Sequence, residues 1–256
     1  MEGFIKTDKL TIGYNGRPLI KDIDIEIKKG EIITIIGPNG VGKSTLLKSI
    51  ARQTDVIGGS IFIDDKELSK MSGNELSKKI AVLFTDRIKG EMMSCFDVVA
   101  TGRYPYTGYF GILSKSDRET VENTMKLVKV EELKDRDFKK ISDGQRQRIM
   151  LARALCQEPE IVLLDEPATF LDIRHKLEFL SILEKMKEER KLTVIMSVHE
   201  LDIARKISDR ILCLKGDKID RFGTPEEVFE EEYICELFDV KEDINAYAKE
   251  RNISLF

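Results

Sequence analysis

Two periods of apolar and polar residues alternate along the chain, and their order predicts the class of fold. Short apolar runs typical of β-strands are separated by longer stretches with helical spacing, which indicates an α/β protein. Residues 4–14 and 20–30 alternate apolar with polar positions, which is typical of an antiparallel sheet with one solvent-exposed face. The run 31–37 predicts a buried strand, and a helix is expected from Lys43 to about Arg52.

The middle of the chain, residues 87–158, has helical spacing apart from a stretch rich in aromatic residues at 102–111. We expect this segment to be a helical insert between two halves of one sheet domain, which comprise residues 1–86 and 159–256. On this interpretation the whole chain forms a single domain.

Strand and helix patterns continue beyond the insert. Residues 161–166 and 192–199 predict strands on either side of an amphipathic helix at 175–190. Near the C-terminus, residues 224–227 have the sequence TPEE. A cap residue, a proline in the first turn and a glutamate three residues on predict the start of a further helix.

Composition narrows the possible settings of the protein. The 256 residues carry a formal net charge of −4, which predicts no general affinity for nucleic acid or anionic lipid. Four cysteines lie far apart without a CxxC spacing, which favours inert thiols in a reducing compartment: Cys95, Cys156, Cys213 and Cys235. Without a signal-peptide core or a run of about 18 apolar residues, the chain is expected to be cytosolic and to reach a membrane only by docking.

A glycine-rich motif of the form GxxxxGK[ST] follows the strand predicted at 31–37. It consists of Gly37, Pro38, Asn39, Gly40, Val41, Gly42, Lys43, Ser44 and Thr45. Glycines let successive backbone N–H groups converge on phosphates at the positive end of a helix. Lys43 would add a cation for the β- and γ-phosphates, and Ser44 a hydroxyl ligand for Mg²⁺. The motif therefore predicts a P-loop nucleotide binder, a class that includes kinases and GTPases.

A second candidate group lies at the end of the predicted strand 161–166, where Asp165 and Glu166 follow four apolar residues. Buried carboxylates are costly unless a cation compensates them, so Asp165 would hold Mg²⁺ and Glu166 would orient or deprotonate an attacking water. His199 ends another predicted strand and could bridge Glu166 and the γ-phosphate. A lone histidine at a strand end is more often a surface or core residue than a catalytic one, and His175, on a charged helix, is expected to be structural or exposed.

The order of these motifs resembles an ABC-type ATPase over essentially the whole chain. Residues 141–145, ISDGQ, look like the family signature LSGGQ, and residues 169–172, TFLD, look like the D-loop. Tyr14 falls where the family places an aromatic residue that stacks on adenine, although an ordinary tyrosine at a strand end would look the same. The resemblance implies a P-loop NTPase (RecA-like) core with an N-terminal antiparallel β-subdomain and an inserted helical signature subdomain.

The same resemblance implies ATP and Mg²⁺ as cofactors and a head-to-tail dimer, expected to be a homodimer. Ser142 and Gly144 would contact the γ-phosphate of the partner's ATP, and Gln145 and Asp172 would also lie at the nucleotide. A multi-span permease would be the membrane partner, with a substrate-binding protein contacted only indirectly and no nucleic acid. The chain is then expected at the cytoplasmic face of the cell membrane, as a peripheral subunit.

A finer resemblance concerns residues 102–106, GRYPY, which follow FDVVAT. This stretch looks like that of ATPases from the iron-siderophore, haem and cobalamin importer group. A loop packed for structure, or a turn that starts a helix, is the alternative interpretation.

Two positions depart from the family pattern. Thr85, followed by Asp86, stands where the family usually has a glutamine that reaches Mg²⁺ and the lytic water. Asp143 replaces the first glycine of the signature, and we expect it to cap the following helix, with Arg146 and Arg148 softening its charge. Thr85 is nevertheless retained as a candidate for the metal site, beside Ser44 and Asp165.

These features predict the ATP-hydrolysing subunit that energises an ABC importer for iron-siderophore, haem or cobalamin cargo. One alternative is a soluble ABC-type ATPase in DNA or ribosome processes, but coiled coils, tandem units and basic extensions are missing from the sequence. The other is a nucleotide-gated scaffold that does not hydrolyse ATP. The departures at Thr85 and Asp143 favour a scaffold, whereas Glu166 and His199 argue against it.

Overall fold

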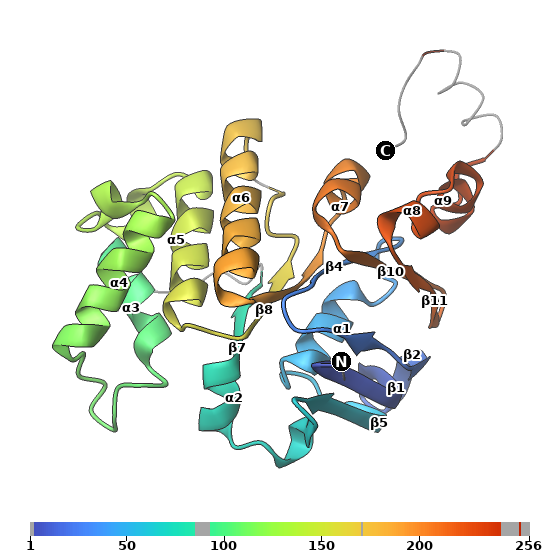
Figure 1. The fold of residues 1–256 in the computed structure, drawn as a ribbon, viewed down its shortest axis with the longest axis horizontal. Helices are drawn as coiled ribbons and strands as arrows, with labels where there is room; N and C mark the ends of the chain where they lie inside the picture. The colour runs from blue at the N-terminus through green and yellow to red at the C-terminus, as the bar shows by residue number, and fades with distance from the viewer. Residues whose placement is uncertain (1–2, 85–92, 170, 242–250, 252–256) are drawn as a thin grey trace. The chain divides into compact units, whose positions relative to one another are not determined.

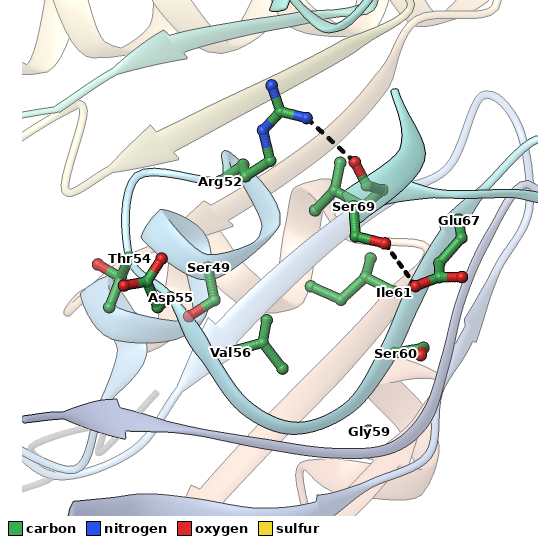
Figure 2. A pocket seen from close by; sticks show the side chains of 11 residues that line it. Ser49, Arg52, Thr54, Asp55, Val56, Gly59, Ser60, Ile61, Glu67 and Ser69 are labelled. Carbon is green, nitrogen blue, oxygen red and sulfur yellow. Dashed lines mark hydrogen bonds between the residues drawn. The ribbon is translucent and has the colours of Figure 1, made fainter. Parts of the chain in front are cut away.

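The computed structural model describes residues 3–84, 93–169, 171–241 and 251. The chain divides into two compact units, one formed by Met1–Met71 with Thr193–Phe256 and the other by Ser72–Leu192 (Figure 1). The predicted helical insert 87–158 falls inside the second unit, and its boundaries stay a prediction.

An antiparallel sheet occupies the start of the first unit. Its strands are β1 (Ile5–Tyr14), β2 (Arg17–Ile23), β3 (Glu26–Ile27), β5 (Val56–Ile63) and β6 (Lys66–Glu67). β1 pairs antiparallel with β2, β3 and β5, and β5 with β6. Ile5, Leu10 and Ile12 of β1 are fully buried, whereas Asp8 and Lys9 are exposed. The predicted sheet with one apolar and one wet face is therefore confirmed.

The first unit also contains a mainly parallel set of strands. They are β4 (Ile32–Ile36), β9 (Thr193–Ser197) and β10 (Arg210–Lys215), with β11 (Lys218–Gly223) antiparallel to β10. Every residue of β4 and β9 is buried, as expected for parallel strands that helices cover on both faces. The helices of this unit are α1 (Lys43–Ile50), α7 (Leu201–Ile207), α8 (Pro225–Val228) and α9 (Glu231–Leu237).

The helix start predicted at residues 224–227 is present. The Thr224 side chain and Glu227 form a capping box, and the Glu227 carboxylate accepts a hydrogen bond from the Thr224 backbone N–H at 2.8 Å. The helix that begins there, α8, nevertheless lasts only four residues, because the chain leaves the helical conformation at Phe229.

The second unit is mainly helical. Its helices are α2 (Gly73–Lys79), α3 (Cys95–Ala100), α4 (Lys115–Leu127), α5 (Asp143–Cys156) and α6 (Ile173–Arg190), and short 3₁₀ turns lie at Thr101–Arg103, Glu131–Leu133 and Phe138–Lys140. Its strands β7 (Ile80–Leu83) and β8 (Ile161–Asp165) run parallel. α3, α4 and α5 pack together (Figure 1). Val98, Val121 and Ile149 on these helices are at most 1% exposed.

All four cysteines are buried and free. Burial raises the pKa of the Cys156 and Cys213 thiols to about 12. Within residues 3–84, 93–169 and 171–241, none of the helices combines the length and the apolar character needed to cross a bilayer.

Candidate nucleotide-binding site

The glycine-rich loop joins β4 to α1 in the first unit. The backbone takes positive φ at Gly37 (146°), Gly40 (77°) and Gly42 (114°), a region that side chains rarely adopt. Space is a second constraint, because a Cβ at Gly37 would lie 2.4 Å from the Leu214 carbonyl oxygen. The local sequence therefore fixes a tight curl of the backbone directly before α1.

Lys43 is only 6% exposed, and its ammonium lies inside this curl. Its Nζ donates to the carbonyl oxygens of Gly37 at 2.7 Å and Pro38 at 3.1 Å. These hydrogen bonds hold the cation over the loop rather than in solvent, at the position where phosphate charge is expected.

The start of α1 differs from the starts of α2 and α4. Ser72 and Ser114 cap those two helices through their side chains. The residue before α1 is Gly42, and among the described residues none caps α1 with its side chain. The first turn of α1 also lacks acidic residues. Backbone N–H groups at such an end suit an anion, so this loop fits a nucleotide phosphate.

Tyr14, the candidate for adenine stacking, is tied to this loop. The Thr45 hydroxyl donates to the Tyr14 hydroxyl at 3.0 Å, from the first turn of α1. Thr45 is 4% exposed and Tyr14 is 48% exposed. The phenol is thus held at the phosphate loop, while about half of the side chain remains accessible to a base.

His199 lies at the same edge of the parallel strands as the loop. It follows β9 by two residues, and β9 pairs in parallel with β4, which leads into Gly37. Carboxyl ends of neighbouring parallel strands meet at one edge of a sheet, and ligands bind there in open α/β sheets. The His199 side chain is exposed.

In the second unit, β8 carries the two carboxylates to its end. Asp165 is the last residue of β8 and is 6% exposed, and Glu166 follows it. Glu166 has φ of 50°, a left-handed conformation that costs a residue with a side chain roughly 1–3 kcal/mol. The Thr169 hydroxyl and backbone N–H both donate to the Glu166 carbonyl, at 3.2 and 3.4 Å, and stabilise this turn.

The signature residues form the start of α5. Ser142 is the N-cap, and its hydroxyl oxygen accepts from the backbone N–H of Gln145 at 3.2 Å. The Gln145 side chain in turn accepts from the Ser142 backbone N–H at 3.1 Å, which completes a capping box. The spacing Ser-x-x-Gln in the sequence is the signal that could have predicted it.

The expectation that Asp143 caps α5 is wrong, because Ser142 occupies the cap and Asp143 is already the first helical residue. The Asp143 carboxylate instead accepts from Arg146 Nη1 at 3.0 Å. Arg148 does not share this role, since its Nη1 donates to the Lys129 carbonyl at 3.2 Å.

Two further contacts join α5 to the residues that follow β8. The Gln147 amide donates to the Pro167 carbonyl at 2.8 Å, and a Cβ built on Gly144 would lie 3.7 Å from Leu171. The sequence patterns did not predict a role for Gln147. The signature helix and the turn after Glu166 therefore form one connected structure within this unit.

Asp172, the last residue of the D-loop motif, is the N-cap of α6. Its carboxylate accepts from the His175 backbone N–H at 2.9 Å and lies 2.9 Å from His175 Nδ1. Both contacts lower the pKa of Asp172, and the hydrogen bond from the His175 backbone has the larger effect. His175 thus has a structural role, one of the two alternatives expected for it. Thr85, Asp86 and Phe170 lie outside the described residues, so the part predicted for Thr85 stays a prediction.

This geometry defines the class of the molecule, a P-loop nucleotide-binding protein of the α/β type. Comparison with known sequences makes the assignment specific. The profile described as ABC transporter matches residues 20–169, and the chain belongs to this family. The predicted family, fold class and ATPase class are thereby confirmed.

Individual relatives extend the match over most of the chain. An uncharacterized ABC transporter ATP-binding protein of Methanocaldococcus jannaschii is 40% identical, over 93% of this chain and 82% of that protein. The iron(3+)-hydroxamate import ATP-binding protein FhuC of Bacillus subtilis is 35% identical, over 94% and 89%. A dimeric ATP-binding cassette with ADP and phosphate bound is similar in structure, with a TM-score of 0.76 and 28% identity over 86% of this chain and 98% of that one.

Proposed function

We propose that this chain is the ATP-hydrolysing subunit of an ABC importer whose cargo is a ferric chelate of the siderophore type. The observation that carries the proposal is the similarity to the hydroxamate import protein of Bacillus subtilis, which extends over 94% of the chain. The stretch GRYPY, which resembles that of the same importer group, contains the buried side chain of Arg103.

Each candidate residue has a task in ATP hydrolysis. Lys43 and the backbone N–H groups of residues 37–45 bind the phosphates, and Tyr14 stacks on adenine. Ser44 and Asp165 are the residues that would hold Mg²⁺, which neutralises charge on the β- and γ-phosphate oxygens, and Thr85 remains a further candidate. Glu166 orients the attacking water and takes its proton, and His199 holds Glu166 and the γ-phosphate in line.

The signature residues serve the ATP of a second copy of the chain in a head-to-tail homodimer. In its capping bond the Ser142 hydroxyl oxygen is an acceptor, so its proton is still available to a phosphate oxygen. Gly144, Gln145 and Asp172 complete this surface. The dimeric cassette described above, bound to ADP and phosphate, supports this arrangement.

The remaining partners follow from the same assignment. A multi-span permease would dock on the dimer at the cytoplasmic face of the membrane, and a substrate-binding protein would act through that permease. Binding and release of nucleotide would close and open the dimer and shift the permease between two states, since the nucleotide contacts differ in each state.

Uptake in the native host tests the cargo. Replacing the chromosomal gene with a Glu166→Gln allele is expected to abolish accumulation of radiolabelled ferric hydroxamate while the protein level is unchanged. Haem and cobalamin uptake, measured in the same strains, should be unaffected. Normal hydroxamate uptake together with lost haem or cobalamin uptake would assign a different cargo, and no transport defect at all would contradict the importer assignment.

A further inference from the structure

Half of the large apolar side chains that are exposed in the described part of the chain belong to one short loop. Ten such side chains are exposed, and five of them lie within residues 104–112, here called the aromatic loop. They are Tyr104 (63% exposed), Tyr106 (38%), Tyr109 (99%), Phe110 (84%) and Ile112 (76%). Exposed apolar side chains gathered in one place mark a surface that meets another molecule.

The base of the aromatic loop is fixed to the helices of its unit. Arg103, 6% exposed, donates from Nε to the Asp117 carboxylate on α4 at 3.0 Å and from Nη1 to the Cys156 carbonyl on α5 at 2.8 Å. Its guanidinium lies 4.0 Å from the centre of the Tyr106 ring, and the Tyr106 hydroxyl donates to the Gln157 carbonyl at 3.0 Å. These contacts fix the start of the loop to α4 and to the end of α5.

The tip of the loop projects from this base. Tyr109 and Phe110 pack edge to face with ring centres 5.6 Å apart, yet both remain almost fully exposed. A Cβ built on either flanking glycine, Gly108 or Gly111, would meet no atom within 4 Å. The tip is thus a convex pair of aromatic rings rather than the wall of a groove.

Three exposed cations lie near the loop, although the whole chain carries a net charge of −4. Lys78 Nζ lies 5.2 Å from the centre of the Tyr106 ring, and Lys115 and Arg118 are exposed in the first turn of α4. Of the nearby carboxylates, Asp117 and Glu158 both pair with Arg103, at 3.0 and 2.8 Å. Asp117 is buried, whereas Glu158 and Glu119 are exposed.

We propose that the aromatic loop inserts its tip into the headgroup region of an anionic phospholipid bilayer. Tyrosine and phenylalanine rings favour this interface, and the flanking cations match a negatively charged lipid surface. A protein partner fits less well, because a stable interface buries roughly 800 Å² on each side. The exposed apolar residues here are confined to nine positions around a convex tip.

Tryptophan fluorescence tests the insertion directly, because the natural chain contains no tryptophan. Phe110→Trp places a single reporter at the tip, and Ile57→Trp places one on β5 as the matched control. With vesicles of equal parts phosphatidylglycerol and phosphatidylcholine, the emission of the Phe110→Trp protein should shift to shorter wavelength and be quenched by brominated lipid chains. The Ile57→Trp emission should not change.

A second variant tests whether the rings supply the affinity. Tyr109→Ser with Phe110→Ser should partition to these vesicles at least about tenfold more weakly, a loss of about 1.4 kcal/mol. Thermal unfolding and ATP turnover without vesicles should be unchanged, so this result is independent of the proposed function. The inference fails if vesicles leave the Phe110→Trp emission unaltered, if the double variant binds them as well as the natural chain, or if the shift appears only with a permease embedded in the vesicles.

Discussion

The hydroxyl of Thr45 donates a hydrogen bond to the hydroxyl of Tyr14 across 3.0 Å, and the two residues are 31 positions apart. This bond ties the end of β1 to the first turn of α1. The candidate platform for the base is therefore set by a residue of the phosphate loop itself, so that the two ends of a nucleotide would be positioned together.

Removing this platform should weaken ATP binding without slowing the chemical step. Tyr14→Ala is expected to raise the KM for ATP about tenfold at nearly constant kcat, because stacking of a base on an aromatic ring contributes about 1–3 kcal/mol. Tyr14→Phe keeps the ring and loses the bond to Thr45, so KM should rise only about threefold. Steady-state kinetics measures both, with Tyr104→Ala as a control in the other unit. An unchanged KM for Tyr14→Ala would remove the residue from the site.

Glu166→Gln should separate binding from hydrolysis. The amide keeps the shape of the side chain but cannot take a proton from water, so ATP turnover should fall by about 100-fold or more. The ATP-bound variant should elute as a dimer in size-exclusion chromatography. Glu160→Gln is the matched control and should hydrolyse ATP normally. The natural Glu160 carboxylate pairs with Lys79 at 3.1 Å. Vigorous turnover by Glu166→Gln would contradict the proposed role.

Neighbouring signature residues should behave differently in stability measurements. Ser142→Ala removes the cap of α5 and should lower the free energy of unfolding by about 1 kcal/mol. Asp143→Ala breaks only an exposed pair with Arg146 and should change it by less than about 0.5 kcal/mol. Urea titration followed by circular dichroism distinguishes the two. Equal losses for both variants would show that Asp143 supports the helix after all.

The buried pair below the aromatic loop predicts a dependence of stability on pH. The hydroxyl of Ser114 and the guanidinium of Arg103 hold the pKa of Asp117 below its ordinary value. Since the folded pKa is the lower one, ionised Asp117 stabilises the fold at neutral pH, and this stabilisation is lost as the pH falls below about 4.

Asp117→Asn should therefore be less stable than the natural chain at neutral pH, by about 2 kcal/mol, because Arg103 keeps its burial and loses a charged partner. Its free energy of unfolding should also fall less steeply in acid. Urea titrations at a series of pH values test both expectations. Curves that stay parallel down to about pH 2 would show that Asp117 contributes nothing to acid sensitivity.

Local periodicity predicted the elements that bury a regular stripe or face. The strands β4 and β9, whose residues are all buried, and the long helices α4, α5 and α6 fall where the patterns place them. α2 went unpredicted, since it has only seven residues, begins with glycine and buries Leu76 alone. A single apolar contact leaves too little periodic signal to reveal a helix.

Candidate site residues were predicted where a short motif holds the whole chemistry, as in residues 37–45. The hydrogen bonds between distant residues were not predicted. Thr45 bonds to Tyr14, and Gln147 to Pro167, only because folding brings these residues together. The Asp143 prediction failed for another reason: of two adjacent residues able to cap a helix, only the one with extended backbone, Ser142, takes that role.

The left-handed backbone at Glu166 places thermal stability and ATP hydrolysis in opposition at one residue. Glycine or asparagine would occupy this conformation at lower conformational cost, so either substitution should make the folded protein more resistant to heat. Neither can accept the proton of water. Variants selected only for resistance to heat should therefore lose glutamate at this position. If cells that need the transporter are placed under the same heat selection and keep glutamate, hydrolysis is also under selection.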